Sequence, residues 1–163
     1  METLARFEET GFSIWMRESG VAFFGTLTVH SLAMALVIGI NIALSLRLLG
    51  FAPRLALAPF TAFFPILWGS VVAIVISGVL LLCAYPAKAL INPVFYLKLI
   101  SLISALVISW KFQTLILQHE TTANDSVRVK TLASLSLVLW VITITAGRFL
   151  AYTHSVLLAS RFY

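Results

Sequence analysis

Residues 21–46 read VAFFGTLTVHSLAMALVIGINIALSL, an apolar run long enough to cross a membrane as a helix. Three more runs of this kind follow, at residues 60–84, 93–117 and 131–158. Each exceeds the roughly 20 residues that span a hydrocarbon layer of about 30 Å. The runs are continuous and lack the alternation of a transmembrane β-strand. The sequence therefore predicts an all-α membrane protein, a bundle of four transmembrane helices that forms one domain over residues 1–163.

The composition supports this prediction. Hydrophobic residues make up 61% of the chain and charged residues 10%, and a soluble protein of this kind would aggregate. The net charge is +5, but the basic residues are spread over the flanks of the spans. We therefore expect membrane lipids as partners, with other membrane or periplasmic subunits as further candidates, and no nucleic acid. A single cysteine, Cys83, excludes an intramolecular disulfide and a cysteine-based metal cage.

The first twenty residues, METLARFEETGFSIWMRESG, have the pattern of an amphipathic helix. Apolar side chains recur at helical spacing, and charged residues occupy the rest of the wheel. This pattern predicts an N-terminal interfacial helix that lies flat in the membrane surface and is anchored by Trp15. Two other placements fit the same pattern, a cover over the mouth of the bundle and a contact with a partner subunit.

The orientation in the membrane is weakly encoded. Four spans place both termini and the second loop on one side, and the Lys and Arg residues divide six to five between the two sides. If Lys98 and Arg148 are set aside as residues within spans, the first and third loops become the better candidates for the cytoplasmic side. The expectation is then that both termini are periplasmic.

Three ionisable residues, His30, Lys98 and Arg148, lie inside or at the edge of apolar runs, and the zigzag of the chain brings them to one end. A charge in hydrocarbon is costly, so this group is the candidate polar site. His30 shares a helix face with Asn41, which predicts that it points into the bundle. The alternatives are a histidine satisfied by a neighbouring helix, and basic side chains that extend to the interface.

The last span carries further candidates. Thr145, Arg148 and Tyr152 share one face, whereas Thr143, Gly147 and His154 share another. Gly147 would let a neighbouring backbone or a flat cofactor come close. Arg148 would bind an anion, such as a haem propionate, a lipid phosphate or a carboxylate.

The segments VHSLAMALVIGINIALSLRLLG (29–50), NPVFYLK (92–98) and LWVITITAGRFLAY (139–152) resemble a family of small bacterial inner-membrane proteins defined by a domain of unknown function. The resemblance covers nearly the whole chain and implies a bacterial inner-membrane location and four spans. It implies no established chemistry. The positions that match the pattern of the family are His30, Asn92, Pro93, Lys98, Gly147 and Arg148.

The leading hypothesis is a membrane subunit that handles haem b or quinone in electron transfer, with no catalytic residue assigned. His30 and His154 are the candidate axial ligands of a haem iron, and Arg148 or Lys98 would pair with the propionates. Without haem, His30 or Tyr152 would hydrogen-bond the carbonyl oxygen of a quinone. His119, in the third loop at the opposite end, is expected to be a surface residue.

The alternative is a structural or accessory subunit of a larger membrane complex. Its polar cluster would tie helices together or hold a lipid, and Trp68, Trp110 and Trp140 would supply interfacial or partner contacts. A small transporter is disfavoured because no acidic residue lies within a span. Motifs of hydrolases and nucleotide enzymes are also missing, so a redox or accessory subunit is favoured over an independent enzyme.

Overall fold

The computed structural model describes residues 6–117 and 127–159, with side chains up to residue 150. These residues form helices and short connections, without a β-strand. The elements are α2 (Gly11–Glu18), α3 (Gly20–Leu49), the 3-10 helix η1 (Ala58–Phe63), α4 (Phe64–Ala84), α5 (Pro86–Leu90), α6 (Pro93–Leu117) and α7 (Val127–Ala159).

Four helices are long and apolar enough to cross a membrane: α3, η1 continued by α4, α6, and α7 as far as Leu150. The predicted all-α bundle of four spans is therefore confirmed, and the chain is a multi-pass membrane protein. The predicted boundaries lie within a few residues of the observed ones. The largest difference is at α7, which begins at Val127, four residues before the predicted start.

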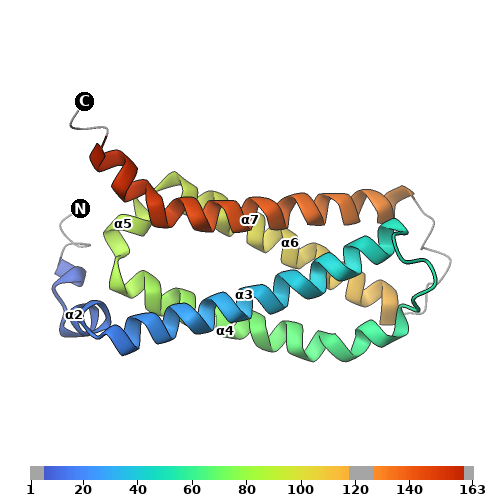
Figure 1. Cartoon of the computed structure of the whole chain (residues 1–163), viewed down its shortest axis with the longest axis horizontal. Coiled ribbons are helices and arrows are strands. Elements are labelled where there is room, and N and C mark those ends of the chain that lie inside the picture. Colours follow the sequence, from blue (N-terminus) through green and yellow to red (C-terminus); the bar gives the residue numbers. More distant parts are fainter. Residues whose placement is uncertain (1–5, 118–126, 160–163) are drawn as a thin grey trace.

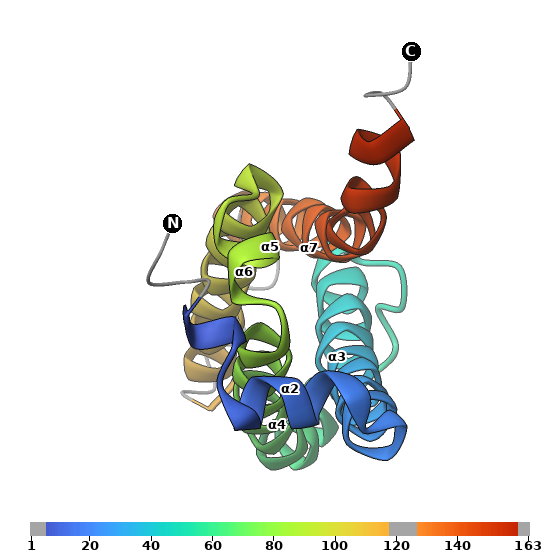
Figure 2. The same cartoon turned by 90° about the vertical axis from the view of Figure 1, so that its left-hand side faces the viewer.

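The four long helices form two antiparallel pairs, α3 with α4 and α6 with α7. Figure 1 shows that α3 begins beside α4 and reaches α7 at its other end, so the pairs cross each other. The end-on view in Figure 2 shows α3 as the link between α4 and α7. Helices α2 and α5 lie at one end of the bundle, here called the α2 end. The connection that starts at Gly50 lies at the other, the Gly50 end.

Local signals set the helix ends. Ser19 caps α3, where its hydroxyl accepts a hydrogen bond from the amide of Ala22. Gly50 ends α3 with a φ of 94°, a left-handed conformation that favours glycine. Pro93 occupies the first turn of α6, where the missing N–H costs nothing, and the Asn92 side chain accepts from the amide of Val94.

Helix α2 packs across the ends of α3 and α4. Ser13 and Met16 are buried, whereas Phe12 and Trp15 are exposed. The carboxylate of Glu8, just before α2, accepts a hydrogen bond from the amide of Ala87 in α5. One face of the amphipathic helix is therefore used by the bundle, and the aromatic face is available to the membrane interface.

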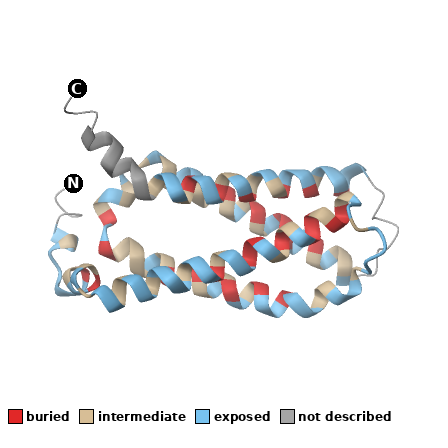
Figure 3. Ribbon diagram, in the orientation of Figure 1, coloured by how far each residue is buried: buried red, intermediate tan, exposed pale blue. Residues whose placement is uncertain are grey.

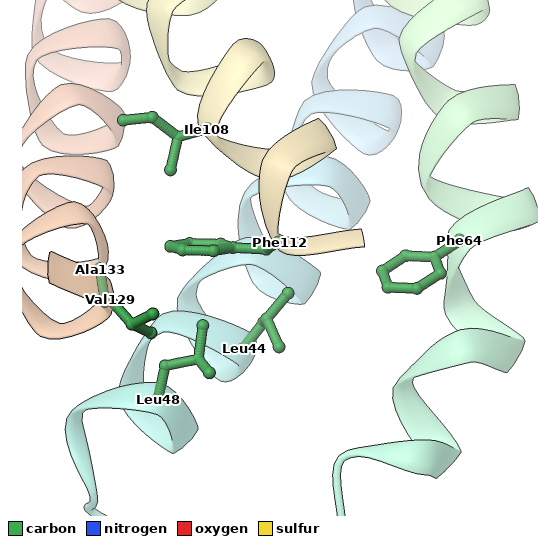
Figure 4. Packing of buried hydrophobic residues seen from close by; sticks show 7 residues of the cluster. All are labelled: Leu44, Leu48, Phe64, Ile108, Phe112, Val129 and Ala133. Carbon is green, nitrogen blue, oxygen red and sulfur yellow. The ribbon is translucent and has the colours of Figure 1, made fainter. Parts of the chain in front are cut away.

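The apolar core is concentrated where the pairs cross and towards the Gly50 end, as the buried residues in Figure 3 show. Figure 4 shows the cluster at the Gly50 end, in which Phe112 of α6 lies beside side chains of α3 and α7. Its members are Leu44, Leu48, Phe64, Ile108, Phe112, Val129 and Ala133.

Trp140 forms the centre of a second cluster. Its side chain is completely buried against small residues that leave room for the indole, Ala33 and Ala105. The expectation that Trp140 makes interfacial or partner contacts is therefore wrong, because this face of α7 points into the bundle. Trp110 is exposed, as expected, and Trp68 donates a hydrogen bond to Gln113 of α6 over 2.6 Å.

Small polar side chains join the helices inside the bundle. Ser109 of α6 donates a hydrogen bond to the side-chain oxygen of Asn41 in α3. Thr143 of α7 donates to the hydroxyl of Ser101 in α6 over 2.9 Å. All four side chains are buried. In lipid, such bonds and the close approach allowed by small residues take over much of the role of hydrophobic burial.

Arg47 stabilises the connection at the Gly50 end. Its guanidinium donates to the carbonyl oxygens of Leu55 and, over 3.1 Å, of Pro53. The side chain is 8% exposed although it is charged. The chain therefore folds back over the end of α3, and backbone carbonyls satisfy the arginine.

We expect Thr143→Val to lower the unfolding temperature in lipid nanodiscs more than Thr145→Val. Each threonine bonds a carbonyl of its own helix over 2.8 Å, but Thr143 also bonds Ser101 of α6, whereas Thr145 is exposed. A double-mutant cycle with Ser101→Ala should give a coupling energy of about 0.6 kcal/mol. Equal destabilisation by the two valine variants would contradict this packing.

Candidate functional site

His30 is held in place by the neighbouring helix. Its Nδ1 lies 2.8 Å from the hydroxyl oxygen of Ser77, so the bond joins α3 to α4 inside the apolar part of the bundle. Ser77 is buried, and His30 is half-buried. The predicted inward direction of His30 agrees with this contact.

The hydrogen bonds of Ser77 favour one position for the proton on the imidazole. The hydroxyl has one hydrogen, and its oxygen lies 2.5 Å from the backbone carbonyl oxygen of Ala73, which is able only to accept. We therefore infer that Ser77 accepts from His30, with the hydrogen of the neutral imidazole on Nδ1. Nε2 then carries a lone pair, and it is the atom that can accept a hydrogen bond or bind a metal.

Gly78 makes room for this ring. A Cβ atom at Gly78 would lie 3.4 Å from Cε1 of His30 and 3.9 Å from Nδ1. The imidazole therefore rests on the backbone of α4, next to its hydrogen-bond partner. Two consecutive residues of α4, Ser77 and Gly78, therefore contact the ring.

The side chain of Lys98 reaches from α6 to α7, as the side chain of His30 reaches from α3 to α4. A Cβ atom at Gly147 would lie 3.7 Å from Cε and 3.9 Å from Nζ of Lys98. The close approach predicted at Gly147 is thus made by a lysine side chain. Lys98 is half-buried, and within the part of the chain that the structure describes its ammonium group has neither a hydrogen-bond nor a salt-bridge partner.

His30 and Lys98 belong to different helix pairs, and both lie in the half of their helix that is nearer the α2 end. The Ser101–Thr143 bond lies one turn deeper in the bundle, next to Lys98 in α6. Among the described residues, the α2 end therefore holds a histidine on one helix pair and, on the other, a lysine whose ammonium group has no protein partner. A ligand with an acidic hydroxyl and an anionic or accepting oxygen would satisfy both groups.

The other predicted residues do not join this pair in the described structure. Arg148 is exposed, as is Thr145, so this face of α7 points away from the bundle. Thr143 and Gly147 lie on the inner face. The side chains of Tyr152 and His154 and the whole of His119 lie outside the described residues.

Sequence reasoning missed Ser77 and Gly78, which position His30. A weak signal was available: buried serines recur seven residues apart in α4, at Ser70 and Ser77, which marks one face of a helix. Nothing in that spacing shows which serine meets the histidine, because this depends on the register between α3 and α4.

A metal site built from several protein ligands has no support in the geometry. Among residues 6–117 and 127–150, no group of three His, Cys, Asp or Glu side chains gathers to hold a metal ion. A haem iron needs fewer protein ligands, and His30 is the histidine whose side chain the structure describes.

No family model, no curated protein and no solved structure matches this chain. The resemblance to a bacterial inner-membrane family therefore stays a prediction, and the geometry of the site carries the functional argument.

We expect nitrogen-15 NMR of histidine-labelled protein in lipid to show His30 as the neutral tautomer protonated at Nδ1. Ser77→Ala removes the acceptor and should abolish the preference for this tautomer, whereas Ser70→Ala, another buried serine of the same helix, should leave it intact. The His30 signal is assigned by its loss in His30→Asn. An unchanged tautomer in Ser77→Ala would contradict the assignment.

Proposed function

We propose that the protein is a small integral membrane subunit that binds the head group of a quinone or quinol at His30 and Lys98, as part of membrane electron transfer. One observation carries the proposal: among the described residues the Lys98 ammonium group has no hydrogen-bond or salt-bridge partner, and it lies towards the same end of the bundle as His30, whose Nδ1 is bonded to Ser77. A basic side chain within a transmembrane span is costly, so a cation without a protein partner close to a histidine marks a candidate ligand site.

The chemistry of a quinol complements both residues. One phenolic hydroxyl donates to Nε2 of His30, and the ammonium group of Lys98 donates to the other oxygen. Lys98 also stabilises negative charge on that oxygen, an effect that is strong where water is excluded. The apolar surroundings suit the ring, as in ligand sites that combine an apolar lining with a few polar groups.

Oxidation of a quinol to a quinone releases two protons and two electrons. In this proposal Nε2 of His30 takes up one proton along the hydrogen bond that it accepts, and the second proton leaves from the oxygen beside Lys98 to water at the α2 end. The electrons would pass to a redox centre of a partner subunit. In this proposal the chain positions the head group and accepts a proton, and it is not an independent enzyme.

Haem b is the second candidate, and the tautomer of His30 favours it. A histidine that ligates a metal usually donates its other N–H to a protein oxygen, as His30 donates to Ser77. Lys98 would pair with a propionate and His154 would be the second axial ligand. Native protein would then show a reduced haem band that is lost in His30→Ala and kept in His119→Ala. A featureless spectrum would exclude haem and leave quinone.

A structural or accessory subunit is the third candidate. It is favoured because the polar residues of the site make contacts that hold neighbouring helices together. His30–Ser77 joins α3 to α4, and Lys98 packs on Gly147. In that case the polar cluster would serve packing or hold a lipid. Asparagine at position 30 would then be an adequate substitute, because it also hydrogen-bonds across helices.

The location forms part of the same proposal. A bacterial inner membrane, with both termini on the periplasmic side, fits the weak charge bias of the loops. Membrane lipids and membrane or periplasmic subunits would then be the partners.

We expect Lys98→Met to raise the Kd of a short-tailed benzoquinol in lipid nanodiscs by about tenfold to a hundredfold. A hydrogen bond to a charged group contributes about 1.5–3 kcal/mol, and each 1.4 kcal/mol is tenfold. Lys111→Met, an exposed lysine of the same helix, is the matched control and should leave the Kd unchanged. The proposal fails if the two variants bind the quinol equally well.

A further inference from the structure

Two basic side chains from different helices meet at one aromatic ring at the α2 end of the bundle. The ring belongs to Tyr85, the residue between α4 and α5. The guanidinium carbon of Arg17, in α2, lies 5.9 Å from the ring centroid, and the ammonium nitrogen of Lys88, in α5, lies 5.7 Å from it. Both distances are within the range of cation–π interactions. Arg17, Tyr85 and Lys88 are here called the Tyr85 site.

Hydrogen bonds tie α2 to the helices on both sides of the ring. The hydroxyl of Ser13 donates to the carbonyl oxygen of Ala84, at the end of α4, over 3.5 Å. Glu8 accepts twice, at its carboxylate from the amide of Ala87 in α5 over 3.1 Å, and at its backbone carbonyl from the guanidinium of Arg17 over 2.7 Å. The fold of the α2 end therefore brings the two cations to the ring.

No carboxylate of the described residues forms a salt bridge with either cation. Glu8 contacts both α5 and Arg17, but its carboxylate is bonded to a backbone amide, and only its backbone carbonyl meets the arginine. Like charges that lie close together repel each other, and an anion placed beside them offsets this repulsion. The Tyr85 site is therefore suited to a small anionic group.

The Tyr85 site is accessible and lies at an end of the membrane spans. Tyr85 and Lys88 are exposed, and Arg17 is half-buried. The span that includes α4 ends at Ala84, the residue before the ring, so the site lies where this span leaves the hydrocarbon. Trp15, on the exposed face of α2, is of the residue type that lies among lipid head groups. Lipid head groups therefore surround the site at this depth.

We propose that the Tyr85 site binds the phosphate of an anionic phospholipid. The guanidinium of Arg17 supplies N–H donors in the geometry that phosphate oxygens accept, and the ammonium group of Lys88 adds a second positive charge. Free phosphate has the same chemistry, but the acyl chains of a lipid hold its head group at the depth of the site. The bound lipid would link α2 to α5, and this inference does not depend on quinone binding at His30 and Lys98.

The test measures the Kd of phosphatidylglycerol by native mass spectrometry of the full chain in a neutral detergent. Arg17→Gln and Lys88→Gln should each raise this Kd about fivefold. Arg54→Gln is the matched control, because it removes the same charge from an exposed arginine of the connection at the Gly50 end, and it should leave the Kd unchanged. Tyr85→Leu should also raise the Kd, although the net charge stays the same, whereas Tyr85→Phe keeps the ring and should bind as the wild type does.

The outcomes separate a built site from diffuse attraction between a lipid and basic residues. If Arg54→Gln weakens binding as much as Arg17→Gln, or if Tyr85→Leu binds as the wild type does, the site does not exist. Phosphatidylcholine with the same acyl chains should bind more weakly, and equal binding would contradict a site for an anionic lipid. Displacement of the lipid by millimolar inorganic phosphate would assign the site to a free anion instead. Thermal unfolding verifies that each variant has folded.

Discussion

A polar group inside a membrane is costly unless the protein itself provides its hydrogen-bond partner, and the rest of this structure depends on that constraint. Water is absent from hydrocarbon, so an unsatisfied hydroxyl or amide is costly. The chain meets the constraint with bonds between helices, from Asn41 to Ser109, from Thr143 to Ser101, and from His30 to Ser77. The His30–Ser77 and Thr143–Ser101 bonds each lie within one helix pair, and the Asn41–Ser109 bond joins α3 of one pair to α6 of the other.

The two ends of the bundle differ in how their polar groups are satisfied. Towards the Gly50 end, apolar side chains such as Phe112 fill the interior, and Arg47 is satisfied by the backbone of the connection. At the α2 end, His30 has one nitrogen bonded to Ser77, and the stem of Lys98 lies against Gly147. Apolar packing therefore dominates at the first end, whereas the second holds the groups that the proposed ligand would bind.

The sequence predicts the four spans well because a membrane helix is encoded by a continuous apolar run. It also predicts the inward direction of His30, since Asn41 shares its face. It does not predict the partner of His30, because Ser77 resembles every other serine in an apolar span until the register of α3 against α4 is known. On α7, helical spacing separates the face of Arg148 from that of Gly147. Only packing shows that Gly147 faces inward and Arg148 outward.

The most direct measurement is photolabelling of the protein in native membranes with a quinone that carries a photoreactive group on its ring, followed by peptide mapping. The account predicts labels close to His30 in α3, Ser77 in α4 and Lys98 in α6, all of which an excess of unlabelled quinol suppresses. Labels confined to the opposite end, around Trp68 and Trp110, or labels that the competitor leaves unchanged, would contradict it.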